Sequence, residues 1–508
     1  MRYLNCCFII SKQTLLNKFD DERIHEEDMV ARTALMDFLA NKIAPFGEKV
    51  AAQRHLKALR EGVLMAMPLV LVGSIFTLIG SFPIEAWTTW LNKHGELDVL
   101  LNTMANNTFG LISLATAFGI AYSLAKSYDT DGPSAGIIAI GAFLLVTPPL
   151  KTDDGFGIPY GLMGGKGLFT AIVVAMITAE IYRQFIQRDF TIKMPKGVPD
   201  AVGRSFAALI PGAVIIILFA AVMKVHQVTG VGSLNNLLAL IIGTPLGLIG
   251  GTLGGTFVAV LLNSVFWFCG VNGGQVVGSV MNPIWLQQAD ANRLALQAGQ
   301  DLPNIITAPF MDLFVYIGGG GATIGLALCL MFLSRSREYK TLGRVSGIPA
   351  LFNINTPILF VFPTVLNPIM FVPFVLTPIV NAVVTYLSMA TGLVPYTTGV
   401  ALPWTTPPII GGFLATGSWQ GAVLQAVLVV ISFLIYLPFF KAADAAHVKA
   451  EAAGVQASES ADEVAELKEV AEHSEERHEH RDKAEGAAAP QDASPSPAEP
   501  SKRTTHRQ

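Results

Sequence analysis

Asn353-Ile354-Asn355-Thr356-Pro357 lies in a run of 96 residues, 345–440, that contains no Asp, Glu, Lys, Arg or His. A soluble domain does not leave so much surface uncharged, because about 25% of the residues of a typical domain are charged. Hydrocarbon offers no hydrogen bonds, so the polar atoms of Asn353, Asn355 and Thr356 need partners in protein, in enclosed water or in a bound polar ligand. The stretch is therefore the first candidate for a binding site.

The composition of the whole chain indicates a membrane protein. Of its 508 residues, 52% are hydrophobic and only 14% are charged. Apolar runs of about 20 residues, which cross a hydrocarbon layer of about 30 Å as helices, recur along the chain. The sequence therefore predicts an all-α polytopic membrane protein, with spans near 62–82, 108–125, 134–150, 167–185, 205–223, 237–263, 310–333, 367–390 and 419–440.

Basic residues indicate which side of the membrane each end of the chain occupies. Arg54, Lys57 and Arg60 come directly before the first apolar run, and Lys441 comes directly after the last one. Because Lys and Arg are concentrated in cytoplasmic segments, we expect both termini in the cytoplasm.

The chain divides by composition into three parts. Residues 1–45 are a mixed N-terminal extension that lacks the residue order of a secretory signal, and Met29 offers a second start. Residues 46–441 are the membrane-embedded part. Residues 442–508 contain 15 acids and 8 bases and are rich in Ala, Glu, Ser and Pro. This composition predicts an acidic, disordered cytoplasmic tail.

Three interrupted apolar segments, at 264–284, 353–368 and 403–412, contain amides, hydroxyls, glycines and indoles. Irregular backbone is tolerated within a membrane only where it lines a cavity. Amides and hydroxyls pair with the hydroxyls of a sugar, and an indole stacks on its apolar face. Each Trp alone is equally typical of an interfacial or packing residue. The candidate substrate-binding residues are Trp267, Asn272, Gly273, Gly274, Asn355, Thr356, Trp404 and Thr405.

Other chemistries find little support in the sequence. Asp312 is the only acid placed inside an expected span of the C-terminal half, which argues against ion coupling and against hydrolysis by paired carboxylates. The glycine-rich loop Gly164–Gly167 lacks the spacing of a P-loop and is interpreted as a turn. Residues 288–304 are expected to form a polar connection outside the bilayer core. The four cysteines show no metal or disulfide spacing, and no basic motif indicates nucleic acid. We expect no cofactor and no metal.

Several motifs between residues 38 and 441 carry a resemblance to a known family. They are Ala51-Ala52-Gln53-Arg54-His55-Leu56, Arg204-Ser205-Phe206-Ala207-Ala208-Leu209-Ile210-Pro211, Asn353-Ile354-Asn355, Leu366-Asn367-Pro368 and Pro403-Trp404-Thr405-Thr406-Pro407-Pro408. This part of the chain resembles the lactose/cellobiose-type enzyme IIC, the membrane permease component of the bacterial phosphoenolpyruvate-dependent sugar phosphotransferase system.

The resemblance implies about ten transmembrane helices, a homodimer and two re-entrant hairpins, near 264–290 and 350–366. It implies a permease in the bacterial cell membrane that carries a sugar such as a β-linked disaccharide. A phosphorylated IIB protein, supplied in turn by IIA, is then the partner that donates a phosphoryl group from its cysteine to the sugar. Both partners are expected to be separate chains.

Two positions depart from the family pattern. Where the family has Gly-Ile-His-Gly, this chain has Gly270-Val271-Asn272-Gly273, and where the family has Asn-Glu-Pro, it has Asn355-Thr356-Pro357. Asn and Thr form hydrogen bonds but do not act as general bases near neutral pH, so no catalytic residue is predicted in this chain. Two hypotheses stay open: a working phosphotransferase permease, and a non-phosphorylating paralogue that acts as a sugar facilitator or sensor.

Overall fold

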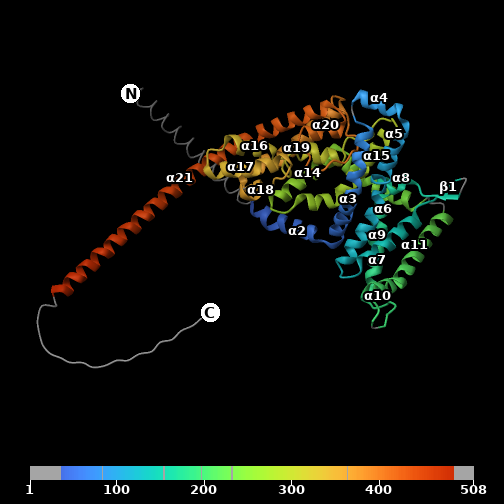
Figure 1. The fold of residues 1–508 in the computed structure, drawn as a ribbon, viewed down its shortest axis with the longest axis horizontal. Helices are drawn as coiled ribbons and strands as arrows, with labels where there is room; N and C mark the ends of the chain where they lie inside the picture. Colours follow the sequence, from blue (N-terminus) through green and yellow to red (C-terminus); the bar gives the residue numbers. More distant parts are fainter. Residues whose placement is uncertain are drawn as a thin grey trace, which may run out of the picture. The chain divides into compact units, whose positions relative to one another are not determined.

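The computed structural model describes residues 36–485, apart from residues 83, 153–154, 196, 230–232 and 363. The chain divides into two compact units, Met1–Asp444 and Ala445–Gln508. The first unit contains the apolar helices and the cavities, and Figure 1 shows how its helices are arranged.

The helices of the N-terminal half form a first bundle, in which α6 packs against α3, α7 and α9 (Figure 1). A Cβ atom on Gly119 of α6 would lie 2.6 Å from the carbonyl oxygen of Gly62 of α3, so only glycine permits this close helix contact. The bundle comprises α3 (Arg54–Gly80), α5 (Gly95–Asn106), α6 (Ile112–Lys126), α7 (Gly132–Val146), α9 (Leu168–Gln187) and α11 (Leu209–Thr229). Its shorter elements are α4 (Glu85–Lys93), η2 (Phe109–Leu111), the antiparallel strands β1 (Leu150–Thr152) and β2 (Gly155–Gly157), α8 (Tyr160–Met163), η3 (Gly165–Gly167) and α10 (Asp200–Ala207). The first two elements, η1 (Leu39–Ile43) and α2 (Ala44–Ala52), pack against the C-terminal half instead, where Leu39 shares a buried cluster with Phe268.

The C-terminal half forms a second group of helices, in which α14 packs against α15 and α19, and α16 packs against α17. Helix α15 also contacts α3 and so joins the two halves. The elements are α12 (Leu234–Leu238), η4 (Ala239–Gly243), α13 (Thr244–Gly250), α14 (Leu253–Phe268), α15 (Gly273–Gln297), η5 (Phe310–Val315), α16 (Ile324–Leu333), α17 (Arg337–Leu351), α18 (Thr356–Val361), α19 (Pro368–Ala390), α20 (Ile410–Thr416) and α21 (Trp419–Glu485).

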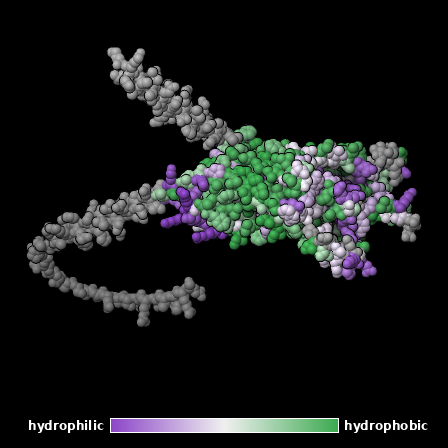
Figure 2. All heavy atoms as spheres, turned by 90° about the horizontal axis from the view of Figure 1, so that it is seen from above, coloured by the Kyte–Doolittle hydropathy of each residue, from purple (hydrophilic) through white to green (hydrophobic). Residues whose placement is uncertain are grey.

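The described residues confirm a mostly helical polytopic membrane protein, with the short pair β1 and β2 as its strands in the described part of the chain. Six helices are long and apolar enough to cross a membrane: Arg54–Gly80, Gly95–Lys126, Gly165–Gln187, Asp200–Val225, Pro368–Ala390 and Trp419–Ala452. A bent pair, Leu234–Gly250 with Leu253–Phe268, and the shorter apolar helices α7 and α16 cover most of the remaining expected spans. Figure 2 shows hydrophobic residues over a broad part of the described surface, with hydrophilic residues gathered beyond it.

Two expected spans are not continuous helices. The span at 237–263 bends by 78° between α13 and α14. The span at 310–333 is interrupted between η5 and α16, where Gly318, Gly319 and Gly321 have positive φ angles of 84°, 87° and 79°. Glycine adopts this backbone readily and other residues do not, so the glycine run ends the helix. The interpretation of residues 310–333 as one helix was wrong for that reason.

Helix α21 continues past Lys441 to Glu485 and therefore includes part of the acidic tail. The Ala and Glu residues of this segment favour helix. Residues 1–35 and 486–508 lie outside the described residues. The division at 45 and 441, and the disorder of the tail, stay predictions.

Candidate functional site

A cavity of ≈ 450 Å³, the main cavity, lies among α14, α15, η5 and the irregular segments of the C-terminal half. Six of the eight predicted substrate-binding residues line it: Trp267, Asn272, Gly274, Asn355, Thr356 and Trp404. Residues from all three interrupted segments are thus brought together. Gly273 and Thr405 are not among the lining residues. Gly273 is buried, and a Cβ atom there would lie 2.1 Å from the carbonyl oxygen of Asn263.

The first wall of the main cavity is the turn between α14 and α15. Asn272 is the N-cap of α15, and its Oδ1 accepts a hydrogen bond from the backbone N–H of Gln275 at 3.0 Å. Arg60 of α3 donates from Nη1 to Oε1 of Gln275 at 3.2 Å. The turn is therefore fixed both by its own cap and by a side chain of the first bundle.

The second wall is the stretch 353–356, whose amides are held by protein atoms. Asn353 accepts a hydrogen bond at Oδ1 from the N–H of Gly318 at 2.6 Å and donates from Nδ2 to the carbonyl of Trp404. Asn355 donates from Nδ2 to the carbonyl of Gly320 at 2.8 Å and to Thr323 Oγ1 at 2.9 Å. The sequence leaves protein, enclosed water and a bound ligand open as partners for these two amides, and the structure shows protein atoms in that role.

The glycine run Gly318–Gly321 faces this second wall. A Cβ atom on Gly319 would lie 2.6 Å from Cγ of Asn355, and one on Gly320 would lie 2.9 Å from Cδ1 of Trp267. The run therefore lets the asparagine and the indole approach the backbone closely. In the sequence these glycines indicate only close packing of a helix, because the same residue type serves both purposes.

The third wall carries Trp404, which is 55% exposed. Gln425 of α21 positions this region: its Oε1 accepts hydrogen bonds from the N–H groups of Ile409 and Gly412, each at 2.6 Å, and its Nε2 donates to the carbonyl of Leu313 at 2.7 Å. One buried amide thus joins the loop that follows Trp404 to η5.

Other residues that line the main cavity are absent from the predicted set, among them Asn263, Asn282, Trp285, Asp312 and Tyr316. Asn263 and Asn282 lie beside the predicted turn in sequence, so widening the segment would have found them. Trp285 and Tyr316 look like ordinary packing residues of apolar helices. Asp312 carries the clearest signal in the sequence, because it is an acid inside an expected span.

A smaller cavity of ≈ 170 Å³ lies beside the main cavity. Gly278, Asn282, Asp312 and Trp404 line both cavities, and Arg60 lines the smaller one. The two cavities therefore adjoin each other.

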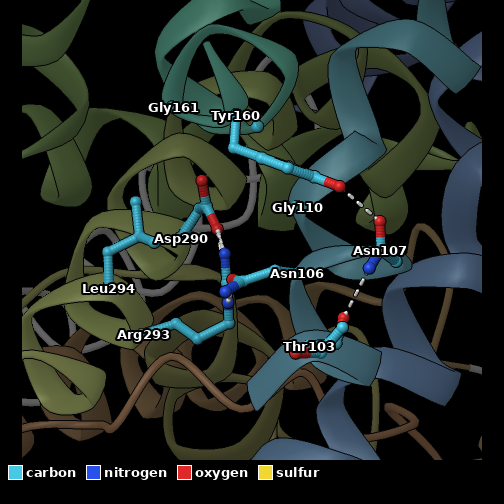
Figure 3. A pocket seen from close by; sticks show the side chains of 10 residues that line it. Thr103, Asn106, Asn107, Gly110, Tyr160, Gly161, Asp290, Arg293 and Leu294 are labelled. Atoms are coloured by element: carbon cyan, nitrogen blue, oxygen red, sulfur yellow. Dashed lines mark hydrogen bonds and ion pairs between the residues drawn. The ribbon is translucent and has the colours of Figure 1, made fainter. Parts of the chain in front are cut away.

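A separate cavity of ≈ 220 Å³ lies between α5, α8 and α15 (Figure 3). Its centre is an ion pair between Asp290 and Arg293, both 1% exposed, with Nη2 and Oδ1 2.8 Å apart. Nη1 of Arg293 also donates to Oδ1 of Asn106 at 2.9 Å and to Oε1 of Gln297 at 3.0 Å. Residues 288–304 were expected to form a polar connection outside the bilayer core; residues up to Gln297 belong to helix α15, and Asp290 and Arg293 are buried in it, while their position relative to the bilayer stays a prediction.

The glycine-rich loop Gly164–Gly167 belongs to the same junction. The N–H of Gly165 donates to Oδ2 of Asp290 at 2.7 Å. The backbone of this loop therefore approaches an anion, and the anion is a carboxylate of the protein. Most polar groups around Asp290 and Arg293 bond one another, so this junction joins the two halves of the chain structurally.

Comparison with known proteins places these features in a family. The family model described as "Phosphotransferase system, EIIC" matches residues 60–378. The lichenan permease IIC component of Bacillus subtilis (strain 168) is 45% identical over 81% of this chain and 94% of its own length. The cellobiose-specific EIIC component of Geobacillus stearothermophilus is 44% identical over 79% and 92%.

A solved structure shows the same fold. The transporter ChbC, the IIC component of an N,N'-diacetylchitobiose-specific phosphotransferase system, superimposes with a TM-score of 0.78 and 40% identity. The match covers 82% of this chain and 99% of that one.

Proposed function

The chain belongs to the EIIC family of sugar permeases of the phosphotransferase system, and its relatives include components of cellobiose, lactose and chitobiose type. We propose that its main cavity binds a β-linked disaccharide. The observation that carries the proposal is the convergence of Trp267, Trp404, Asn272 and Thr356 on one cavity of ≈ 450 Å³. The indoles stack on the apolar faces of the sugar rings, while the amide and hydroxyl pair with ring hydroxyls.

The proposed topology has about ten transmembrane helices, cytoplasmic termini and two re-entrant hairpins, near 264–290 and 350–366. The turns before α15 and α18 lie in these hairpins and supply lining residues of the main cavity, as a re-entrant backbone does when it faces a cavity. The membrane is the bacterial cell membrane.

We further propose a homodimer. The outward face of the first bundle has an apolar groove of ≈ 560 Å³ between α7 and α11, lined in part by Ile137, Leu209 and Ile216. These three side chains are 62%, 53% and 37% exposed. Such a face is available to lipid or to a second copy, and the family resemblance favours the second copy.

The proposed partner is a phosphorylated IIB protein, recharged by IIA, that donates its phosphoryl group to the delivered sugar. Asn272 and Thr356 occupy the positions of the family His and Glu, and neither side chain removes a proton efficiently near neutral pH. This observation favours a second candidate function, in which the chain is a sugar facilitator or sensor without phosphorylation.

Uptake into membrane vesicles tests both readings. Vesicles containing the full chain and phosphorylated IIB are supplied with labelled cellobiose. Accumulation of sugar phosphate supports the phosphotransferase permease, and equilibration of free sugar without phosphate consumption supports the facilitator. If cellobiose, lactose and N,N'-diacetylchitobiose show neither saturable binding nor uptake, the sugar function is contradicted.

A further inference from the structure

We propose that Asp312 supplies the carboxylate with which the cavity recognises its sugar, by accepting hydrogen bonds from sugar hydroxyls. This inference rests on the proposed sugar function and assigns one further binding residue to the same site. Four observations carry it: the exposure of Asp312, its lack of a protein partner, its place between the two cavities and its charge.

Asp312 is exposed within an otherwise buried element. The other five residues of η5, Phe310, Met311, Leu313, Phe314 and Val315, are buried, while Asp312 is exposed. Its exposed surface faces cavity space, since Asp312 lines both the main cavity and the smaller one. The backbone of η5 therefore places its one acid toward the proposed ligand.

The carboxylate of Asp312 has no hydrogen bond and no ion pair with any residue that the structure describes. By contrast, Asp290 receives hydrogen bonds from Gly165 and Arg293. Arg60 shares the smaller cavity with Asp312, but its guanidinium donates a hydrogen bond to Oε1 of Gln275. A carboxylate removed from bulk water is costly unless donors satisfy it. Sugar hydroxyls are such donors.

Asp312 also lies where the two cavities adjoin. Trp404 and Asn282 line both cavities with it. A disaccharide with one ring in each cavity would pass beside Trp404 and Asp312. An indole against the apolar face of a ring and a carboxylate at its hydroxyl edge are complementary to the two kinds of surface that a sugar presents.

Charge distinguishes Asp312 from the other polar residues of the site. It is the only charged residue that lines the main cavity in the described part of the chain. A carboxylate, when ionised, accepts hydrogen bonds roughly twice as strong as those accepted by the neutral side chains of Asn272 and Thr356. The ionised form of Asp312 would therefore be the strongest side-chain acceptor among the described residues that line the main cavity.

Binding of cellobiose to the purified full chain in detergent tests this role by isothermal titration calorimetry. Asp312→Asn keeps the size of the side chain and removes the charge, and it is expected to raise the Kd roughly 10- to 100-fold. Asp312→Glu keeps the charge and is expected to bind more tightly than Asp312→Asn. Asp301→Asn makes the same change at an exposed acid outside both cavities, and its Kd should stay within about 2-fold of wild type.

The outcomes separate this inference from the proposed function. If wild type binds cellobiose and Asp312→Asn binds it equally well, the role of Asp312 is overturned and the sugar function stands. If wild type binds none of cellobiose, lactose and N,N'-diacetylchitobiose, both are overturned. If Asp312→Asn does not fold, monodeoxy cellobioses are titrated into wild type. A charged acceptor predicts that at least one analogue binds about 10-fold more weakly, and a uniform loss below 3-fold overturns the proposal.

Discussion

The junction between Asp290 and Arg293 gives the sharpest prediction on stability. Asp290→Ala removes a carboxylate that receives hydrogen bonds from the N–H of Gly165 at 2.7 Å and from Nε of Arg293 at 2.9 Å. The guanidinium of Arg293 stays buried and keeps its hydrogen bonds to Asn106 and Gln297 and its contact with the ring of Phe109, but no described acid remains paired with it. Breaking a buried pair by removing one partner costs about 3–5 kcal/mol, so the free energy of unfolding should fall by that amount.

A double-mutant cycle tests the reasoning. Arg293→Met should also be destabilising, because it leaves the carboxylate with one described donor. The double variant Asp290→Ala/Arg293→Met should lose about 1–3 kcal/mol less than the sum of the single variants, because no charge remains buried. Asp301→Ala, at an exposed acid, is the matched control and should change stability by less than about 0.5 kcal/mol.

Unfolding by SDS in mixed micelles can be followed by alkylation of Cys269 and Cys329, which are buried. The background carries Ser at positions 6 and 7, so that only these two thiols react. A value for Asp290→Ala within about 1 kcal/mol of wild type would refute the argument, as would additive single variants. Either result would mean that the ion pair is solvated or that the surroundings relax to replace it.

The remaining predictions concern the main cavity. Trp267→Ala and Trp404→Ala should each weaken cellobiose binding roughly 10-fold in calorimetry, because each removes a stacking surface; an unchanged Kd for both would exclude the indoles from the site. Gly320→Ala places a Cβ atom 2.9 Å from Cδ1 of Trp267 and should weaken binding no more than Trp267→Ala does, so a larger loss would contradict displacement of the indole as the cause. Asn272→His combined with Thr356→Glu should raise sugar-phosphate formation with phosphorylated IIB by roughly 10²–10⁴-fold, and no gain in the vesicle assay would mean that a missing base does not limit the chemistry.

Most of the main cavity is predictable because polar residues in a long uncharged stretch find no hydrogen-bond partners in hydrocarbon and must face protein, enclosed water or a ligand. Asn355, Thr356 and Trp404 drew attention on that ground, and all three line the cavity. Asp312 is absent from the predicted lining residues because a single acid in an expected span bears, in the sequence, only on ion coupling. The glycine run Gly318–Gly321 is equally compatible with close helix packing, since sequence alone does not distinguish a close helix contact from a break with positive φ.

The junction at Asp290 and Arg293 was not predictable from local sequence. An acid and a base three residues apart near the end of an apolar segment are typical of a solvated helix end. Their burial depends on Gly165, which lies 125 residues away from Asp290 in the chain. The same contact explains the glycine-rich loop, whose pattern predicts a turn but not the carboxylate that occupies it.

Among the described residues, some polar residues of the main cavity are held by hydrogen bonds to the protein and others are not. This difference explains how the cavity can bind a sugar although Asn272 and Thr356 replace the family His and Glu. Asn353 and Asn355 bond to backbone and hydroxyl groups around the glycine run, so they shape the walls without a ligand. When the walls of a cavity are ordered before the ligand binds, binding does not incur the free-energy cost of ordering them. Asn272 and Thr356 lie on these fixed walls, where a change of side chain alters the chemistry offered to the sugar more than the shape of the cavity. Sugar binding is therefore compatible both with a phosphotransferase permease and with a facilitator or sensor that does not phosphorylate its sugar. What separates these two candidate functions is whether a side chain at position 272 or 356 can accept a proton.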